Sequence, residues 1–400
     1  MKIKIHRGTN QIGGCITEIE SNLGTRIIID IGANLEKIDG NKQTEIELEG
    51  LTYGNPKIDG VLVTHYHGDH IGLYNKVLKD IPIYTSEITK ELFLIVQTYL
   101  SYAKLVQKED IEKIKKFNTF TIPNSFNIRD IKITPIMVDH SAFDSHMFLV
   151  ECDGKKLLHT GDFRMHGQRG NQVREAVKKY VGKVDCLITE GTMFSRNDEK
   201  ILTETELQQK AKEIFQDNKY NFILCSSTNI DRIAAFHKAA ISANKMFICD
   251  NFELKILNYI TSKARSNLYK FNDVKERKVY LYGNNMKNAM KENGFVILIR
   301  ANDYFKSILE EFPNSRIIYS EWRGYLKSKD VKYKFLQDMV NDDYIYLHTS
   351  GHADKASIKE IIDITEPNAV IPIHTEHKEM IKELTNNSKI LEDEEEFLII

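Results

Sequence analysis

Three things that the 400-residue sequence lacks narrow the kind of protein it encodes. Its five cysteines lie far apart and form no CxxC pair, which argues against a thiolate zinc site and a disulfide framework, and favours a reducing compartment. No apolar run approaches the length of a membrane span, and the first residues, MKIKIHRGTN, lack the apolar core of a signal peptide. The sequence therefore predicts a soluble cytoplasmic protein with no membrane partner.

An excess of positive charge is also lacking. The 55 lysines and arginines stand against 57 acidic residues, for a formal net charge of −2. A polyanion such as a nucleic acid would therefore have to be held by a local patch rather than by a global field. The 42% of hydrophobic residues can build a sizeable core, and the length indicates two or three domains.

The pattern of apolar residues changes along the chain. Up to about residue 190, short β-branched runs punctuated by glycine predict strands. From about residue 195, helices and strands alternate in the manner of a parallel sheet with crossovers, and a pattern of strand followed by histidine returns after about residue 345. We therefore predict an α/β protein in which residues 1–195 and 346–400 form one domain, interrupted by an inserted domain of residues 196–345. The predicted strands are 26–30, 60–65, 131–138, 155–160, 184–190, 221–228 and 246–250, and the predicted helices are 87–106, 203–216 and 229–243.

The stretch VLVTHYHGDHIG, residues 61–72, crowds ionisable side chains onto one turn. His65 and His67 are two positions apart, so in extended backbone they point the same way, as two ligands of one metal ion must. Asp69 and His70 follow Gly68, where the chain can turn and present two further ligands. A lone histidine is more often a core or surface residue, but four such residues in this order after an apolar strand predict a metal site.

Further acidic and histidine residues follow other apolar strands. Side chains from several strands converge when those strands end along one edge of a sheet. Each of these residues alone is more often a cap or a hydrogen-bonded structural residue than a ligand, and only their joint pattern favours a metal site. They are Asp30, His140, Asp162, Glu190, His352 and His374.

The motif THYHGDHIG resembles the metal-binding signature of the metallo-β-lactamase superfamily. The similarity extends to Asp30 in IIIDIG, His140 in DHSAFDS and Asp162 in HTGDFR. The segments TEGT, TSGHAD and PIHTEH resemble three motifs of the β-CASP nucleases, and SSTNIDRI and YGNNM resemble segments near the RNA path of the ribonuclease J group. The implied fold is α/β: a metallo-β-lactamase αββα sandwich of residues 1–195 and 346–400 with an inserted β-CASP α/β domain of residues 196–345.

The resemblance implies a centre of two divalent metal ions. One ion would be bound by His65, His67 and His140, and the other by Asp69, His70 and His374, with Asp162 as the bridge. Imidazoles and carboxylates without a thiolate suit zinc, and manganese also fits. Such a pair would hold a bridging hydroxide as the nucleophile for phosphodiester hydrolysis.

The same resemblance implies roles for the remaining residues around the centre. Asp69, Asp162 and His352 are expected to be catalytic, with His352 beside the scissile phosphate. Asp30 and Glu190 are expected to orient the ligating histidines. Asp144 is expected to support the loop of His140.

Residues 227–232 are the candidate substrate contacts. Ser227, Thr228 and Asn229 stand at a predicted strand-to-helix junction, where free N–H groups attract phosphate, and Arg232 adds charge. Similarity to the ribonuclease J group implies a pocket for a 5′-monophosphate. A plain N-cap, with Arg232 paired to a carboxylate, explains the same residues equally well. The one tryptophan, Trp322, is expected to pack rather than to stack on a base.

The leading hypothesis is a ribonuclease that acts on single-stranded RNA as a 5′-to-3′ exonuclease, an endonuclease or both. The alternatives are a β-CASP nuclease acting on DNA, a hydrolase of a small ester with the same fold, and a non-catalytic partner that binds nucleic acid. Two departures bear on the details. The chain ends soon after His374, without the C-terminal domain common in the ribonuclease J group, so monomer and homodimer both stay open. Thr228 and Thr375 stand where that group usually has serine and glycine.

Overall fold

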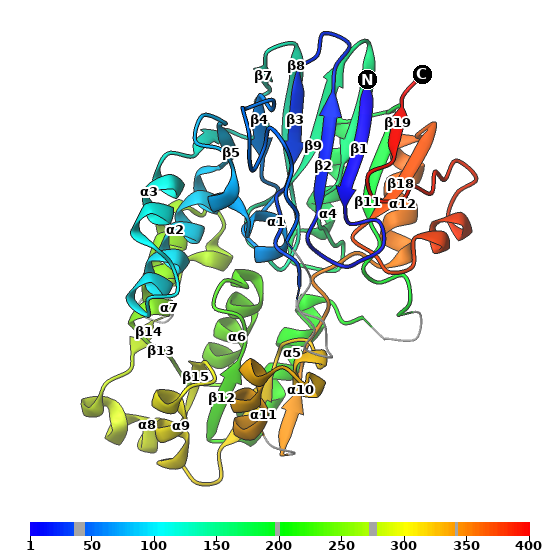
Figure 1. Ribbon diagram of the computed structural model, residues 1–400. Helices are drawn as coiled ribbons and strands as arrows, with labels where there is room; N and C mark the ends of the chain where they lie inside the picture. The colour runs from blue at the N-terminus through cyan, green and yellow to red at the C-terminus, as the bar shows by residue number, and fades with distance from the viewer. Residues whose placement is uncertain (36–44, 197–200, 272–277, 341–342) are drawn as a thin grey trace.

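The computed structural model describes residues 1–35, 45–196, 201–271, 278–340 and 343–400. Three β-sheets organise them (Figure 1). The first sheet runs in the order β19 (Glu396–Leu398), β1 (Lys2–Arg7), β2 (Ile16–Glu20), β3 (Arg26–Ile29), β4 (Gly60–Leu62), β5 (Ile83–Ser86) and β6 (Asn118–Phe120). The second runs in the order β18 (Ala369–Ile373), β11 (Cys186–Glu190), β10 (Lys155–His159), β9 (Ser145–Cys152), β8 (Ile131–Val138) and β7 (Phe126–Ile128).

The third sheet is built entirely from parallel neighbours. It runs in the order β14 (Val279–Leu281), β13 (Met246–Cys249), β15 (Phe295–Ile299), β12 (Tyr220–Leu224), β16 (Arg316–Tyr319) and β17 (Tyr344–Tyr346). The helices are α1 (Gly68–Ile71), α2 (Glu87–Tyr102), α3 (Lys108–Lys115), α4 (Gly170–Tyr180), α5 (Glu204–Asp217), α6 (Ile230–Ser242), α7 (Asn251–Lys263), α8 (Lys287–Asn293), α9 (Asp303–Glu310), α10 (Gly324–Lys327), α11 (Lys334–Val340) and α12 (Lys355–Thr365).

The first two sheets pack face to face. Ile5 and Ile27 of the first sheet and Phe148 and Ile371 of the second belong to one buried cluster between them. Because side chains alternate along a strand, the opposite face of each sheet is free to take helices. Helices α4 and α12 pack against the second sheet, and α2 and α3 lie against the first. The predicted αββα sandwich is confirmed.

The third sheet has its own two helical layers. Helices α5, α6 and α7 pack on one face, and α8, α9 and α11 pack on the other. The buried cluster under α6 and α7 continues into the one under α2 and α3, so the sandwich and the third sheet meet through a shared apolar core. The limits proposed for the two domains, residues 195 and 346, stay a prediction.

Local signals account for where several helices begin and end. Helix α5 starts with the predicted capping box, in which the Thr203 hydroxyl accepts from the Glu206 N–H and the Glu206 carboxylate accepts from the Thr203 N–H. Helix α2 ends at Tyr102 instead of the predicted residue 106. Lys104 has a φ of 59°, in the left-handed region, so the helix cannot continue through it.

Two further sequence-based expectations can be compared with the described residues. No helix among these residues is long and apolar enough to cross a lipid bilayer. The five cysteines, Cys15, Cys152, Cys186, Cys225 and Cys249, are buried and free, as expected from their spacing.

Candidate metal centre

The predicted metal ligands all lie at or just beyond the carboxyl ends of strands. His65 and His67 follow β4, and the turn at Gly68 leads into α1, which carries Asp69 and His70. Figure 1 shows α1 on the side of the sandwich that faces α6. His140, Asp162 and His374 come from β8, β10 and β18 of the second sheet, so both sheets contribute to one site.

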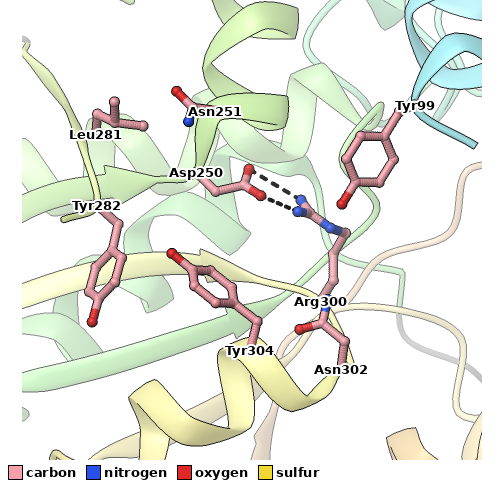
Figure 2. A pocket seen from close by; sticks show the side chains of 8 residues that line it. All are labelled: Tyr99, Asp250, Asn251, Leu281, Tyr282, Arg300, Asn302 and Tyr304. Carbon is pink, nitrogen blue, oxygen red and sulfur yellow. Dashed lines mark hydrogen bonds and ion pairs between the residues drawn. The ribbon is translucent and has the colours of Figure 1, made fainter. Parts of the chain in front are cut away.

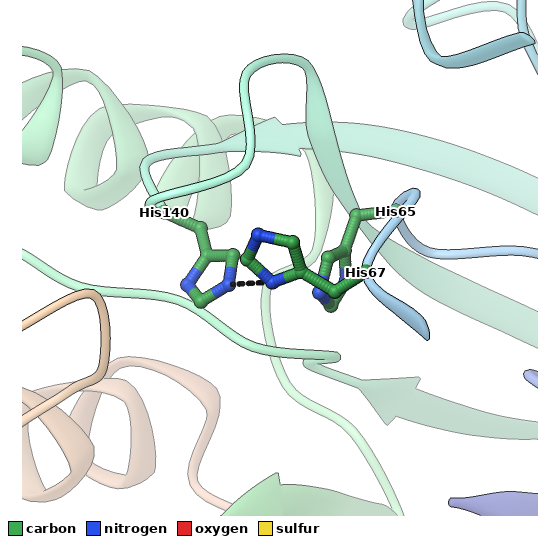
Figure 3. A group of neighbouring side chains, drawn as sticks. All are labelled: His65, His67 and His140. Carbon is green, nitrogen blue, oxygen red and sulfur yellow. Dashed lines mark hydrogen bonds between the residues drawn. The ribbon is translucent and has the colours of Figure 1, made fainter. Parts of the chain in front are cut away.

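The first group of ligand atoms belongs to His65, His67 and His140 (Figure 3). Their candidate ligand atoms lie within 4.8 Å of one another, and Nε2 of His140 is 3.3 Å from Nδ1 of His67. Nδ1 of His140 lies 2.6 Å from the carbonyl oxygen of Gly351, which sets the orientation of the ring. This is the trio predicted to share one ion.

A second group consists of Asp69, His70 and His374, whose candidate ligand atoms also lie within 4.8 Å of one another. Oδ2 of Asp69 is 3.2 Å from Nε2 of His374 and 3.9 Å from Nε2 of His70. His374 has a φ of 54°, a left-handed backbone that directs its side chain from the end of β18. These are the residues predicted for the other ion.

Asp162 lies between the two groups. Its Oδ2 is 3.9 Å from Nε2 of His65, 3.7 Å from that of His140, 3.2 Å from that of His70 and 3.7 Å from that of His374. One carboxylate thus approaches histidines of both groups, as a bridging ligand must.

Buried polar atoms without hydrogen-bond partners test whether these residues fit metal ions. Among the described residues, the buried atoms without a hydrogen-bond partner include Nε2 of His65 and Oδ1 of Asp162. Such atoms are rare in folded proteins and call for a specific explanation. His65 belongs to the first ligand group and Asp162 lies between the two groups, so divalent cations bound by these residues would satisfy both atoms.

The protonation states favour metal binding as well. Burial lowers the pKa of His65 and His140 well below the usual value and that of His67 to about 4, which leaves neutral rings able to ligate. Burial also acts to lower the pKa of His70, but Asp162 and the other nearby carboxylates raise it well above its usual value. A cation would replace that proton.

Residues behind the ligands hold them in place. Oδ2 of Asp30 is 2.7 Å from Nδ1 of His70, and its carboxylate also accepts from the N–H and hydroxyl of Thr64 at 2.8 Å. Thr192, which the sequence analysis missed, places its hydroxyl 2.7 Å from Nδ1 of His374. The sequence signal was its position in TEGT, two residues after Glu190. Each contact fixes one ring, as in known metal sites.

Glu190 and His352 form a pair at the edge of the centre. Nδ1 of His352 is 2.9 Å from Oε2 of Glu190 and 3.6 Å from Oδ2 of Asp162. Burial alone would lower the pKa of His352, but the carboxylates of Glu190 and Asp162 raise it to about 9. His352 is therefore a charged donor, and its side chain is 23% exposed.

Asp144 acts on the loop rather than on a ring. Its carboxylate accepts a hydrogen bond from the Ser86 hydroxyl, and its carbonyl accepts from the Thr89 hydroxyl at 3.1 Å. Ser86 is the N-cap of α2. Asp144 therefore ties the loop after His140 to the start of α2.

The segment predicted to contact substrate lies next to the metal-binding turn. Ser227 and Thr228 are half-buried beyond the end of β12, and the Thr228 carbonyl accepts from the hydroxyl of Tyr66 at 2.8 Å. Tyr66 stands between His65 and His67, so the segment is anchored directly to the metal-binding turn.

Asn229 and Arg232 have structural partners instead. The Asn229 side chain caps α6 by accepting from the Arg232 N–H at 3.3 Å. The Arg232 guanidinium is fully buried and pairs with Glu204 at 3.0 Å. Its side chain is therefore unavailable to a ligand in this conformation, which corrects the expectation that it adds charge to the phosphate pocket. The alternative, pairing with a carboxylate, accounts for its position.

A buried charge network, also missed in the sequence, surrounds these residues. Arg164 donates to Asp139 at 2.8 Å, to Glu204 at 2.9 Å and to the Ser350 carbonyl at 3.1 Å. Asp139 precedes His140, and Ser350 lies two residues before His352. The network thus links loops of the metal centre to α5.

Trp322 is not a core residue. It is 36% exposed, and the Arg196 guanidinium lies 5.4 Å from its ring centre. Of the expected core or interdomain packing, burial in a core was wrong: the ring is partly exposed and lies edge to face with that of Tyr325, with centres 5.5 Å apart.

Comparisons with known proteins agree with this geometry. Residues 25–219 match the family described as a beta-lactamase superfamily domain. Residues 339–385 match the Zn-dependent metallo-hydrolase RNA specificity domain.

Relatives match along nearly the whole chain. Ribonuclease J of Mycoplasma genitalium is 25% identical over 97% of this chain and 70% of its own length. Ribonuclease J of Helicobacter pylori strain B128 is 24% identical over 96% of this chain, which spans only 57% of that protein. A crystal structure of a protein of unknown function from Enterococcus faecalis V583 shares the fold, with a TM-score of 0.77, 18% identity and coverage of 99% of both chains. Residues 25–219 therefore carry a beta-lactamase superfamily domain, and nearly the whole chain is similar to the ribonuclease J proteins.

Proposed function

We propose that this protein is a metal-dependent phosphodiesterase that hydrolyses single-stranded RNA. The observation that carries the proposal is the position of Asp162, whose Oδ2 lies within 4 Å of histidines from both ligand groups. Two divalent cations, which we propose are zinc, would activate water and draw charge from the phosphate oxygens. RNA is favoured over DNA and small esters by the match to the RNA specificity domain and by the ribonuclease J relatives.

The chain's own residues have distinct roles in this proposal. His65, His67 and His140 would hold one cation, Asp69, His70 and His374 would hold the other, and Asp162 would be shared. The carboxylates of Asp69 and Asp162 also place negative charge beside the water molecule that would attack the phosphate. Asp30 and Glu190 act indirectly, because their contacts to His70 and His352 orient those rings.

His352 is the proposed proton donor. Its Nδ1 is held by Glu190 at 2.9 Å, which leaves Nε2 for the substrate. Because the carboxylates of Glu190 and Asp162 raise the pKa of His352, its charged form can stabilise the phosphate and give a proton to the leaving oxygen. A ring at this place would serve hydrolysis of any phosphodiester, so it does not by itself select RNA.

Ser227 and Thr228 are proposed to hold a phosphate at the 5′ end of the strand. Their support is the link through Tyr66 to the metal-binding turn and the start of α6, where N–H groups attract anions. Asn229 contributes as the cap of that helix. A 5′-end pocket so close to the centre favours stepwise removal of nucleotides. The five free cysteines suit action in the reducing cytoplasm.

The test is a time course of strand cleavage by the metal-loaded protein. Matched single-stranded RNA and DNA with monophosphate, triphosphate or hydroxyl 5′ ends are compared on denaturing gels, with Asp162→Asn as the inactive control. Release of mononucleotides from monophosphorylated RNA is the expected result. Internal cuts indifferent to the 5′ end would refute the 5′-end pocket, preference for DNA would refute the RNA assignment, and cleavage of neither strand would refute the function.

A further inference from the structure

A second candidate site lies at the third sheet, away from the metal-binding turn. A cavity of about 280 Å³ opens at the carboxyl ends of β13, β14 and β15 (Figure 2). Asp250, Tyr282 and Arg300 each directly follow one of these strands, and Tyr99 of α2 closes the cavity from the sandwich side. Ligands of open parallel sheets bind in this position.

Charge in the cavity is already balanced. The guanidinium of Arg300 forms an ion pair with Asp250 (Figure 2), and it lies 5.0 Å from the ring centre of Phe252 and 5.1 Å from that of Phe305. The Tyr99 ring centre is 5.7 Å away as well, so the arginine is held by a carboxylate and three rings. A neutral planar group suits this cavity better than a phosphate, because a phosphate would have to compete with Asp250.

Three tyrosines line the cavity, and the rings of Tyr99 and Tyr304 are only partly covered, although Tyr99 packs on Phe252 with ring centres 4.2 Å apart. Tyr99 is 42% exposed and Tyr304 is 51% exposed, and the Tyr282 and Tyr304 rings meet edge to face with centres 6.1 Å apart. The side-chain amide of Asn302, whose oxygen caps α9, adds a donor. Aromatic rings with a few polar groups, in a volume at the small end of ligand sites, fit a nucleobase.

The cavity shares a sheet edge with the proposed 5′-end pocket. Strand β15, which ends just before Arg300, is the neighbour of β12, which leads into Ser227. Ser227 in turn hydrogen-bonds Glu253, in the first turn of α7. The carboxyl edge of the third sheet therefore runs from the cavity to the segment anchored on the metal-binding turn.

We propose that this cavity stacks one base of the single-stranded RNA, away from the metal centre, and so makes binding depend on strand length. The proposal rests on the proposed function for the identity of the strand. A free mononucleotide carries the same base, so it is the other ligand whose chemistry fits the cavity. The strand is favoured because the cavity and the Ser227 segment lie on one edge.

Equilibrium binding tests the proposal without relying on cleavage. Metal-loaded protein is titrated against fluorescent single-stranded RNA made resistant to hydrolysis by phosphorothioate linkages, as a long strand and as a dinucleotide. Tyr304→Ala and Tyr99→Ala should weaken binding of the long strand about 5- to 100-fold, the range for loss of one stacked base. Tyr304→Phe, which keeps the ring, should bind like the wild type.

A matched control comes from the same helix as Tyr99. Tyr102 is 80% exposed on α2 and does not line the cavity, so Tyr102→Ala should bind both strands normally. The dinucleotide should bind all variants equally. Tyr99 and Tyr304 are about half exposed, and unchanged urea midpoints would verify that each variant is folded.

The outcomes separate this proposal from the proposed function. Equal affinity of wild type, Tyr304→Ala and Tyr99→Ala for the long strand would overturn the base site while leaving the ribonuclease intact. A cavity that takes a free mononucleotide, with no effect of Tyr304→Ala on the long strand, would overturn it too. Loss of long-strand binding in Tyr304→Ala, in a protein that cleaves nothing, would support the site and refute only the function. A wild type that binds no RNA would refute both.

Discussion

Replacing Glu253 with glutamine should make the protein resist alkaline destabilisation. The Glu253 side chain is 1% exposed in the first turn of α7, and its Oε1 has no hydrogen-bond partner among the described residues. Burial raises its pKa to about 8, although the hydrogen bond from Ser227 and the charge of Arg300 act in the opposite direction. The folded protein therefore holds this carboxyl neutral at pH 7, whereas the unfolded chain ionises it.

The size of the effect follows from the two pKa values. With a pKa near 4.5 in the unfolded chain and about 8 in the folded protein, the stability contributed by the neutral carboxyl is complete below about pH 4.5 and is lost as the pH rises through 8. Between pH 6 and pH 9 this loss amounts to about 3 kcal/mol. A glutamine keeps the shape of the side chain and has no proton to lose, so the variant does not lose this part of its stability as the pH rises.

Urea unfolding at pH 6 and pH 9 measures the difference. Every other titrating group is shared, so the change in the free energy of unfolding should be about 3 kcal/mol smaller for Glu253→Gln than for the wild type. Ser227→Ala tests the partner, since removal of its hydrogen bond should raise the pKa of Glu253 further. Equal pH dependence in wild type and Glu253→Gln would refute a neutral Glu253.

Three further predictions concern the centre and its support. Asp30→Asn removes the charge behind His70 and should lower metal affinity about 10- to 100-fold in a metal titration, whereas unchanged affinity would show that the ring needs no such partner. Glu204→Gln leaves the buried charge of Arg232 with a weaker partner and should cost about 3 to 5 kcal/mol in urea unfolding; a cost below about 1 kcal/mol would contradict the role of the network. Chelation should lower the thermal midpoint and added zinc should restore it, and Asp162→Asn should respond far less; equal responses would argue against a metal at Asp162.

That these histidines and aspartates gather in space was predictable, because part of the group is local in sequence. His65, His67, Asp69 and His70 share one turn, and the other ligands each follow an apolar strand, which is where a shared sheet edge collects side chains. The capping box at Thr203 was predictable for the same reason, since both partners lie within one helical turn.

Contacts between distant segments were not predictable. Thr192 and His374 are separated by 182 positions, and no periodic pattern connects them. Arg232 was read correctly as part of a helix start, but its direction depends on Glu204, which comes from another helix. Trp322 was misplaced because a single aromatic residue gives no signal of which way its loop turns.

The measurement that tests the central claim most directly is a metal titration of RNA cleavage. Chelator-treated protein should cleave no single-stranded RNA, and activity should rise with added zinc or manganese until two ions are bound per chain. His67→Ala and His374→Ala, one from each ligand group, should each lose activity together with bound metal. Full cleavage by metal-free protein, or by either variant, would contradict the account.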